Sequence, residues 1–119
     1  MFKQILLSKI HRATVTACDP NYNGSICIDK DLLDASGMCE FERVEIFNLN
    51  NAERFSTYVI VGRAGSGEIS INGAAALINK PGDRIIIINY GLLHTEEIAS
   101  HKPVIVLVDA HNKPVKIKK

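Results

Sequence analysis

The 119-residue chain has no tryptophan, only three cysteines and an aromatic content of 6%. Cys18, Cys27 and Cys39 form no C-x-x-C pair, and an odd number of cysteines cannot give a closed disulfide framework. The four histidines are scattered without the spacing of metal ligands. We therefore expect reduced thiols and no bound metal.

Long apolar runs and an excess of one charge are also absent. The longest runs, such as Val104–Val108, fall far short of a membrane span, and the stretch Phe2–Leu7 lacks the length and cleavage site of a signal peptide. Fourteen basic and 13 acidic residues leave a net charge of +1, so no global field attracts nucleic acid or an acidic membrane surface. These absences predict a cytoplasmic protein without a nucleic-acid or membrane partner.

What the chain does have is a hydrophobic content of 46% and frequent punctuation by proline, glycine and asparagine. β-Branched residues crowd the intervening stretches, which predicts one domain over residues 1–119, mainly β, built as a small closed barrel with short helices. The predicted strands are Gln4–Leu7, His11–Thr16, Ser25–Ile28, Val44–Leu49, Arg54–Val61, Glu68–Ile71, Arg84–Asn89, Val104–Asp109 and Val115–Lys118. Short helices are predicted over Asp31–Ser36, ended by Gly37, and over Thr95–Ser100, capped by Thr95.

Two glycine-containing segments invite functional interpretations. Gly62–Gly67 has the outer glycines of a P-loop, but Glu68-Ile69 follows where Lys-Ser/Thr is required, so we predict a hairpin loop. Asn23-Gly24-Ser25 lies in a dense turn cluster between two strands, and its local pattern is that of an ordinary β-turn.

Period-2 alternation predicts which side chains share a strand face. On the N-terminal strand, Lys9 and His11 fall on one face together with Ala13 and Val15. Further along, Arg54, Ser56, Tyr58 and Ile60 share a face, opposite to Phe55, Thr57, Val59 and Val61. Arg54 and Tyr58 can therefore point into one site while Thr57 points elsewhere.

Four motifs recur in a specific order: K-x-H-R at residues 9–12, Y-x-G-S at 22–25, R-F-S-T-Y at 54–58 and N-G-A-A-A at 72–76. Each is weak alone, but their joint order and spacing are specific. From Lys9 to about Asn89, and more loosely to the C-terminus, the chain resembles the aspartate decarboxylase family. These are pyruvoyl-dependent enzymes that convert L-aspartate to β-alanine for pantothenate biosynthesis.

The resemblance implies a double-psi β-barrel and a homotetramer with active sites near subunit boundaries. It also implies a proenzyme that cleaves itself between Gly24 and Ser25 into residues 1–24 and 25–119, with a processing helper protein as an open possibility. Ser25 becomes a covalent pyruvoyl group, which forms a Schiff base with the substrate amine, so neither pyridoxal phosphate nor a metal is needed. The residues permit this chemistry, because a serine hydroxyl can attack the preceding carbonyl and Gly24 tolerates a strained or positive-φ backbone.

Individual roles follow from the same resemblance. Tyr58 is expected to donate a proton after carbon dioxide leaves, and Thr57 to stabilise the oxyanion on the Gly24 carbonyl. His11 and Tyr22 are expected near the processing site. The substrate-binding residues are Lys9, Arg54, Thr57, Asn72, Gly73, Ala74 and Ala75. Lys9 and Arg54 would hold the two carboxylates, although the sequence does not say which holds which.

Each of these residues also has an ordinary structural interpretation. Lys9 could be a snorkelling side chain, Arg54 a rim arginine and Tyr58 a member of a cross-strand pair. Asn72-Gly73 could be a simple turn before a short helix. A non-catalytic barrel that binds RNA through the basic segment Lys113–Lys119 is the rival function, but the chain lacks a basic stripe interleaved with stacking aromatics.

Overall fold

The computed structural model describes residues 1–119, and strands dominate it. The strands are β1 (Phe2–Thr14), β2 (Ala17–Asp19), β3 (Ser25–Asp29), β4 (Arg43–Asn48), β5 (Arg54–Gly62), β6 (Ile69–Asn72), β7 (Arg84–His94), β8 (Val104–Val108) and β9 (Pro114–Lys118). The helical elements are α1 (Lys30–Ser36), the 3₁₀ helix η1 (Gly73–Ile78) and α2 (Thr95–Ile98). The prediction of a mainly β fold with short helices is confirmed. No helix has the length and apolar character needed to cross a membrane.

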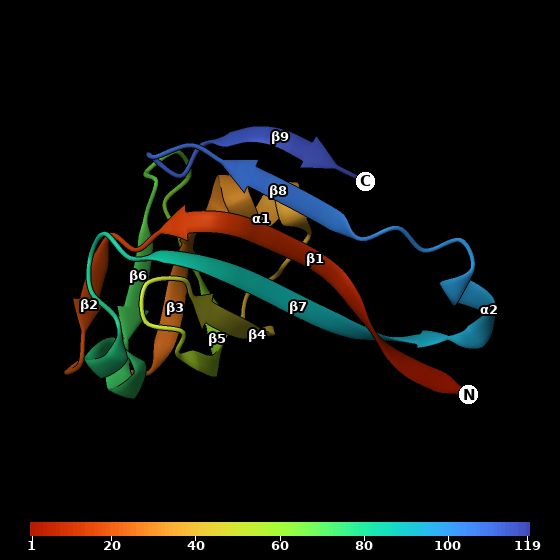
Figure 1. Cartoon of the computed structure of the whole chain (residues 1–119), viewed down its shortest axis with the longest axis horizontal. Coiled ribbons are helices and arrows are strands. Elements are labelled where there is room, and N and C mark those ends of the chain that lie inside the picture. Colours follow the sequence, from red (N-terminus) through yellow and green to blue (C-terminus); the bar gives the residue numbers. More distant parts are fainter.

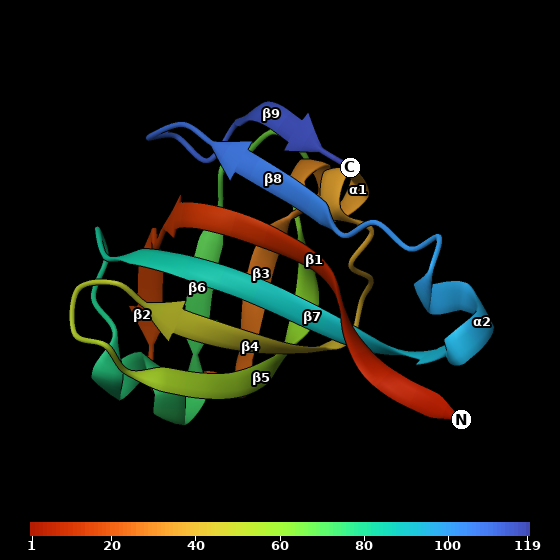
Figure 2. The same cartoon turned by 45° about the vertical axis from the view of Figure 1, so that its right-hand side comes forward.

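The strands form one mixed sheet in the order β2-β6-β3-β5-β4-β7-β1-β8-β9. β5 joins two layers, because its first half pairs with β4 and its second half with β3. In Figure 1 and Figure 2 the long strands β1 and β7 run crosswise to β3 and β6. The Thr16 amide donates to the Ile69 carbonyl at 2.8 Å and ties the layers together at one corner. The arrangement is consistent with a double-psi barrel, although β2 and β9 remain as edges and the sheet does not close.

The core between the layers is aliphatic. Ile10, Ile26, Ile46, Ile71 and Ile87 are fully buried and come from five different strands. They belong to a cluster of 16 buried residues that needs no disulfide, in agreement with the three free thiols. The sheet therefore presents β3, β5 and β6 on a rigid support.

β1 is one long strand where two short ones were predicted, and it contains two register shifts against β7. The second shift falls between Ile10 and Ala13, where Arg12 has a φ of 63°. This bulge places Ala13 on the same buried face as Ile10, while Lys9 and His11 stay on the other. The prediction that Lys9, His11, Ala13 and Val15 share one face was therefore wrong.

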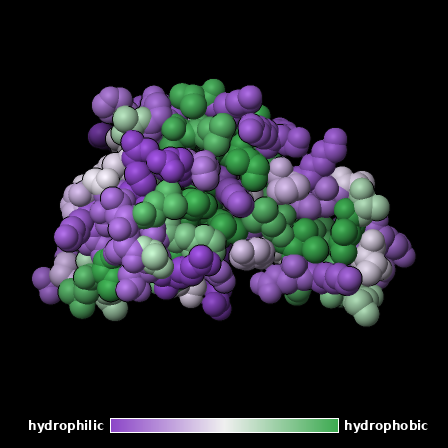
Figure 3. All heavy atoms as spheres, viewed as in Figure 1, coloured by the Kyte–Doolittle hydropathy of each residue, from purple (hydrophilic) through white to green (hydrophobic).

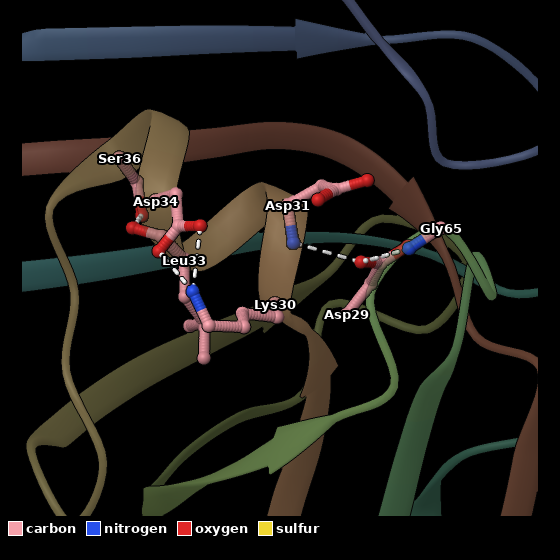
Figure 4. A network of polar contacts seen from close by, with 7 residues as sticks. All are labelled: Asp29, Lys30, Asp31, Leu33, Asp34, Ser36 and Gly65. Carbon is pink, nitrogen blue, oxygen red and sulfur yellow. Dashed lines mark hydrogen bonds and ion pairs between the residues drawn. The ribbon is translucent and has the colours of Figure 1, made fainter.

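The junction between β3 and α1 is held by Asp29, which is buried at the end of β3 (Figure 4). Its carboxylate accepts hydrogen bonds from the backbone amides of Asp31 at 2.8 Å, Gly65 at 3.0 Å and Gly67 at 2.7 Å. Burial alone would raise the pKa of Asp29, but these amide donors hold it below its usual value. Gly37 ends α1 with a φ of 85°, as predicted.

The structure departs from the predicted elements in three further places. β2 was not predicted, and β7 continues to His94, five residues beyond the predicted end at Asn89. Because β1 and β7 pair over their whole length, they extend together past the barrel. The cap of α2 is His94 rather than the predicted Thr95; its ring accepts from the Glu96 amide while Glu97 accepts from the His94 amide.

Candidate active site

Ser25 opens β3 with its side chain completely buried. Its hydroxyl donates to the Asn23 carbonyl at 3.1 Å and accepts from the Asn72 side-chain amide at 3.1 Å. Asn72 is placed there by the antiparallel pairing of β3 with β6, in which Ser25 and Asn72 are direct partners. The structure thus joins two predicted site residues that lie 47 positions apart in sequence.

The turn after Asn72 packs against the predicted cleavage site. Gly73 has a φ of 80°, and a Cβ atom there would lie 2.6 Å from the Gly24 Cα and 2.9 Å from the Gly24 nitrogen. The positive φ expected at Gly24 is found at Gly73 instead, and a Cβ atom on Gly24 would meet nothing within 4 Å. Only glycine at position 73 lets η1 start this close to the Gly24-Ser25 segment.

This contact gives a matched pair of substitutions. Gly73→Ala should lower the free energy of unfolding by about 2–4 kcal/mol, because the new methyl group is overpacked against backbone atoms and the residue keeps a positive φ. Gly24→Ala should lower it by less than about 1 kcal/mol, since no neighbour is displaced. Urea denaturation of both variants measures the difference; equal losses would show that Gly73 and Gly24 do not pack as described.

A cleft of ≈ 320 Å³ opens beside this pair of strands. Its lining residues are Ala17, Asp19, Tyr22, Cys27, Ile60, Glu68, Ser70 and Asn72. Of these only Tyr22 and Asn72 were predicted as site residues. Cys27 shares the face of Ser25, two residues further along β3, a relation that period-2 alternation could have revealed.

The thiol of Cys27 stays protonated at neutral pH. Burial, the nearby Glu68 carboxylate and a hydrogen bond to that carboxylate raise the pKa of Cys27 to about 11. Glu68 also accepts a hydrogen bond from the Ser70 hydroxyl at 2.8 Å. A protonated thiol is a poor nucleophile, so Cys27 is not a candidate for the reactive group.

Two residues with predicted roles, Thr57 and Tyr58, lie on β5, which pairs with β3. The parallel register pairs Ile26 with Val59, so Ser25 and Tyr58 each precede that pair by one residue, and Gly24 and Thr57 by two. Tyr58 is partly exposed and Thr57 is half-buried on the opposite face, where it pairs with Val44. The predicted alternation along residues 54–58 is confirmed by their exposure pattern.

Arg54 is the first residue of β5 and lies on the same face as Tyr58, four residues before it in the strand. Its guanidinium carbon lies 4.5 Å from the centre of the Phe47 ring, and both residues line a second hollow of ≈ 270 Å³. The ring holds the guanidinium group in place without using any of its N–H donors. The donors of Arg54 are therefore available to a carboxylate.

Lys9 and His11 lie on β1, which is separated from β3 by β7, β4 and β5. Both are half-buried. Burial and the positive charges of Arg12, Lys9 and Lys118 lower the pKa of His11. The structure thus places His11 among cations of β1 and β9 and does not bring it or Lys9 to Ser25 within one chain.

Comparison with known proteins agrees with this geometry. Residues 1–115 match the family model described as aspartate decarboxylase. The aspartate 1-decarboxylase of Cupriavidus necator is 54% identical over 119 residues, covering 100% of this chain and 99% of the relative. That of Caldicellulosiruptor bescii is 56% identical over 117 residues, covering 98% and 91%. That of Bordetella pertussis is 52% identical over 119 residues, covering 100% and 98%.

These similarities extend over the whole chain, including the region after Asn89 where the sequence resemblance is looser. They favour an enzyme over the rival nucleic-acid-binding barrel. The buried serine, the amide that holds it and the glycine turn packed against its amino side all fall within the matched region. This chain belongs to the aspartate decarboxylase family.

Proposed function

We propose that this protein removes the α-carboxylate of L-aspartate to give β-alanine and carbon dioxide, a step that supplies pantothenate biosynthesis. The observation that carries the proposal is the placement of Ser25, buried and hydrogen-bonded to Asn72 beside an open cleft, in a chain of this family. The reactive group is made from Ser25 itself.

Self-cleavage would proceed at the Gly24-Ser25 peptide bond. The Ser25 hydroxyl leaves its hydrogen bond to the Asn23 carbonyl and attacks the Gly24 carbonyl carbon, so that the peptide C–N bond breaks and an ester forms. Loss of the Ser25 α-proton then expels the Gly24 carboxylate, which ends chain 1–24. Water replaces the remaining nitrogen, which leaves as ammonia, and residues 25–119 begin with a pyruvoyl group.

The surroundings of Ser25 suit such a group. The Asn72 side chain, which now donates to the hydroxyl, can donate to a carbonyl oxygen in its place, and the cleft offers room for a ligand beside it. When present, the group supplies a ketone that bonds the substrate amine and accepts the electron pair released with carbon dioxide. Thr57 on β5 is level with Gly24 in the register of β3 on β5. This position supports the proposal that the Thr57 hydroxyl donates to the oxyanion formed on Gly24 during cleavage.

Tyr58 is the proposed proton donor to the substrate carbon. It stands beside Ser25 in the register of β3 on β5 and shares a face with Arg54. A phenol is protonated at neutral pH and can act as a general acid. Arg54 would hold a substrate carboxylate with its paired N–H donors, and the backbone of Gly73, Ala74 and Ala75 would line the opposite wall of the pocket.

Lys9 completes this site only if it comes from another copy of the chain. One row of paired residues crosses four strands: Lys9 on β1, Ile88 on β7, Glu45 on β4 and Ser56 on β5. At about 4.8 Å per strand, Lys9 lies roughly 14 Å from β5 along the sheet. The carboxylates of aspartate are only a few ångströms apart, which supports a shared site between subunits of a homotetramer.

The surface agrees with such an assembly. Phe2 and Leu92 are 64% and 73% exposed on the extension of β1 and β7, and Figure 3 shows apolar residues reaching this projecting end. Large apolar side chains gathered on a projecting arm are typical of an interaction surface. A second copy of the chain is the proposed occupant.

Arg54→Ala and Lys9→Ala should each impair aspartate turnover far more than folding. Loss of one charge-assisted contact in a partly desolvated pocket corresponds to about 2–3 kcal/mol, or roughly 30- to 150-fold in kcat/KM. Steady-state kinetics on processed, folded protein measure the loss. A variant that keeps the parent value would remove that residue from the substrate site.

The activity itself is tested with the purified full chain and L-aspartate labelled at the α-carboxyl carbon. The proposal predicts one labelled carbon dioxide and one β-alanine for each aspartate consumed, without added pyridoxal phosphate. Label retained in a deaminated or transaminated product would contradict it.

A further inference from the structure

Two elements of the proposed substrate pocket are joined by a network of asparagines that none of the roles above uses. The elements are the start of β5, which carries Arg54, and η1, whose first residues are assigned to the opposite wall in the proposed function. The network consists of Asn48, Asn51 and Asn79. Asn48 is the last residue of β4 and Asn51 lies in the turn from β4 into β5, whereas Asn79 follows η1 directly.

The contacts form a continuous link. The Asn79 side chain donates to the Ala75 carbonyl at 2.7 Å and accepts from the Asn48 side chain at 2.9 Å. The Asn51 side chain donates to the Ile78 carbonyl at 2.6 Å. The Ile78 carbonyl of η1 is therefore held directly by the turn that leads into Arg54, and the Ala75 carbonyl is held through Asn79, which is bonded to Asn48.

The turn itself is fixed by the same side chains. The side-chain oxygen of Asn48 accepts hydrogen bonds from the backbone amides of Asn50 and Asn51. The side-chain oxygen of Asn51 accepts a hydrogen bond from the backbone amide of Glu53 at 2.9 Å. Glu53 directly precedes Arg54, so the backbone at Arg54 is linked to the asparagines that hydrogen-bond to η1. Any shift of η1 has to break a hydrogen bond of this network.

Burial makes the network rigid. Asn48 is 3% exposed and Asn79 is 5% exposed, and no buried side-chain polar atom in the structure lacks a hydrogen-bond partner. A buried amide that loses its partner incurs its full desolvation cost, so alternative arrangements are disfavoured. The first residues of η1 are small: Gly73 packs on Gly24 and Ala75 on the hydrophobic core, and the asparagine network adds polar contacts to these.

We infer that Asn48, Asn51 and Asn79 are positioning residues that fix the distance between Arg54 and the Gly73–Ala75 wall and thereby set affinity for the substrate. They touch neither Ser25 nor the predicted cleavage site, so they should govern KM more than kcat. This inference rests on the proposed function. It extends that function by assigning the geometry of the pocket to residues outside it.

The test compares three variants of the full chain. Asn79→Ala removes both central hydrogen bonds, and the exposed Asn51→Ala removes the outer one with little risk to folding. Asn112→Gly is the control. Asn112 is 1% exposed and makes three hydrogen bonds, to Thr14 and Gly67, and glycine accommodates its φ of 60°.

Asn79→Ala should raise KM for aspartate about tenfold or more with kcat within about threefold, because misplacement of binding groups by a fraction of an ångström weakens productive binding. Asn51→Ala should raise KM in the same direction, by less. Asn112→Gly should lower the melting temperature at least as much as Asn79→Ala and leave KM unchanged. If Asn79→Ala does not fold, the KM of Asn51→Ala for aspartate is the test of the inference.

Hydrogen exchange separates failure of this inference from failure of the proposed function. The Asn79→Ala and Asn51→Ala variants, but not Asn112→Gly, should exchange amides of residues 73–78 faster than the parent. An active parent whose asparagine variants keep the parent KM would overturn the inference. So would an equal rise of KM in Asn112→Gly, or unchanged exchange over residues 73–78. A parent that does not decarboxylate aspartate would overturn the proposed function. Hydrogen exchange over residues 73–78 would still test whether the asparagine network holds η1.

Discussion

Ser25→Ala is expected to leave the 119-residue chain uncut and without activity. The change removes the oxygen that, in the proposed mechanism, attacks the Gly24 carbonyl and then leaves with the Gly24 carboxylate, so no pyruvoyl group can form. The fold should survive, because alanine fits the buried position, and the Asn23 carbonyl and the Asn72 side-chain amide each lose only one hydrogen bond. Denaturing electrophoresis, together with a carbon dioxide assay, measures both outcomes.

The control for this variant is Ser70→Ala. Ser70 is another buried serine, which lines the cleft next to the Ser25–Asn72 pair, and its hydroxyl is bonded to Glu68. Ser70→Ala should process at Gly24-Ser25 like the parent. Decarboxylation by purified Ser25→Ala protein would rule out a reactive group derived from Ser25.

Tyr58→Phe is expected to be processed normally, to bind aspartate and to turn over far more slowly. Cleavage precedes substrate binding and does not use the phenol, whereas protonation of the substrate carbon does. Loss of a general acid lowers kcat by roughly 10²- to 10⁴-fold. Rapid-quench or steady-state assays on fully processed protein give the ratio.

Two further measurements separate a proton donor from a packing residue. The melting temperature of Tyr58→Phe should stay close to that of the parent, because Tyr58 is 38% exposed and phenylalanine keeps its ring. Incorporation of deuterium from solvent into β-alanine should become slower in the same proportion as kcat. An unchanged kcat would leave Tyr58 with a packing role only.

Local sequence patterns predicted the features of the fold that depend on a single strand or on a single helix end. The alternation of Arg54 to Tyr58 and the end of α1 at Gly37 are of this kind. Periodicity failed on β1, because the bulge at Arg12 moves Ala13 to the other face. A bulge depends on how the strand pairs with β7, and nothing in the local pattern marks it.

The site divides in the same way. The motifs identified Ser25 and Asn72, and pairing of β3 with β6 explains why they meet. Cys27 and Glu68 in the cleft were missed; alternation along β3 could have indicated Cys27, but the contact with Glu68, which directly precedes β6, arises only in the folded protein. The distance of Lys9 from β5 was also beyond the sequence, since the order β5-β4-β7-β1 is a property of the whole sheet.

The most direct test is the intact mass of the purified parent chain under denaturing conditions. Self-cleavage at Gly24-Ser25 predicts two species, residues 1–24 with a free carboxylate and residues 25–119 with a pyruvoyl terminus. The larger species should be lighter than a serine-started chain by the mass of ammonia and should shift by one hydrazone on treatment with a hydrazine. A single uncut species of 13.1 kDa that still decarboxylates aspartate would contradict a pyruvoyl mechanism in this protein.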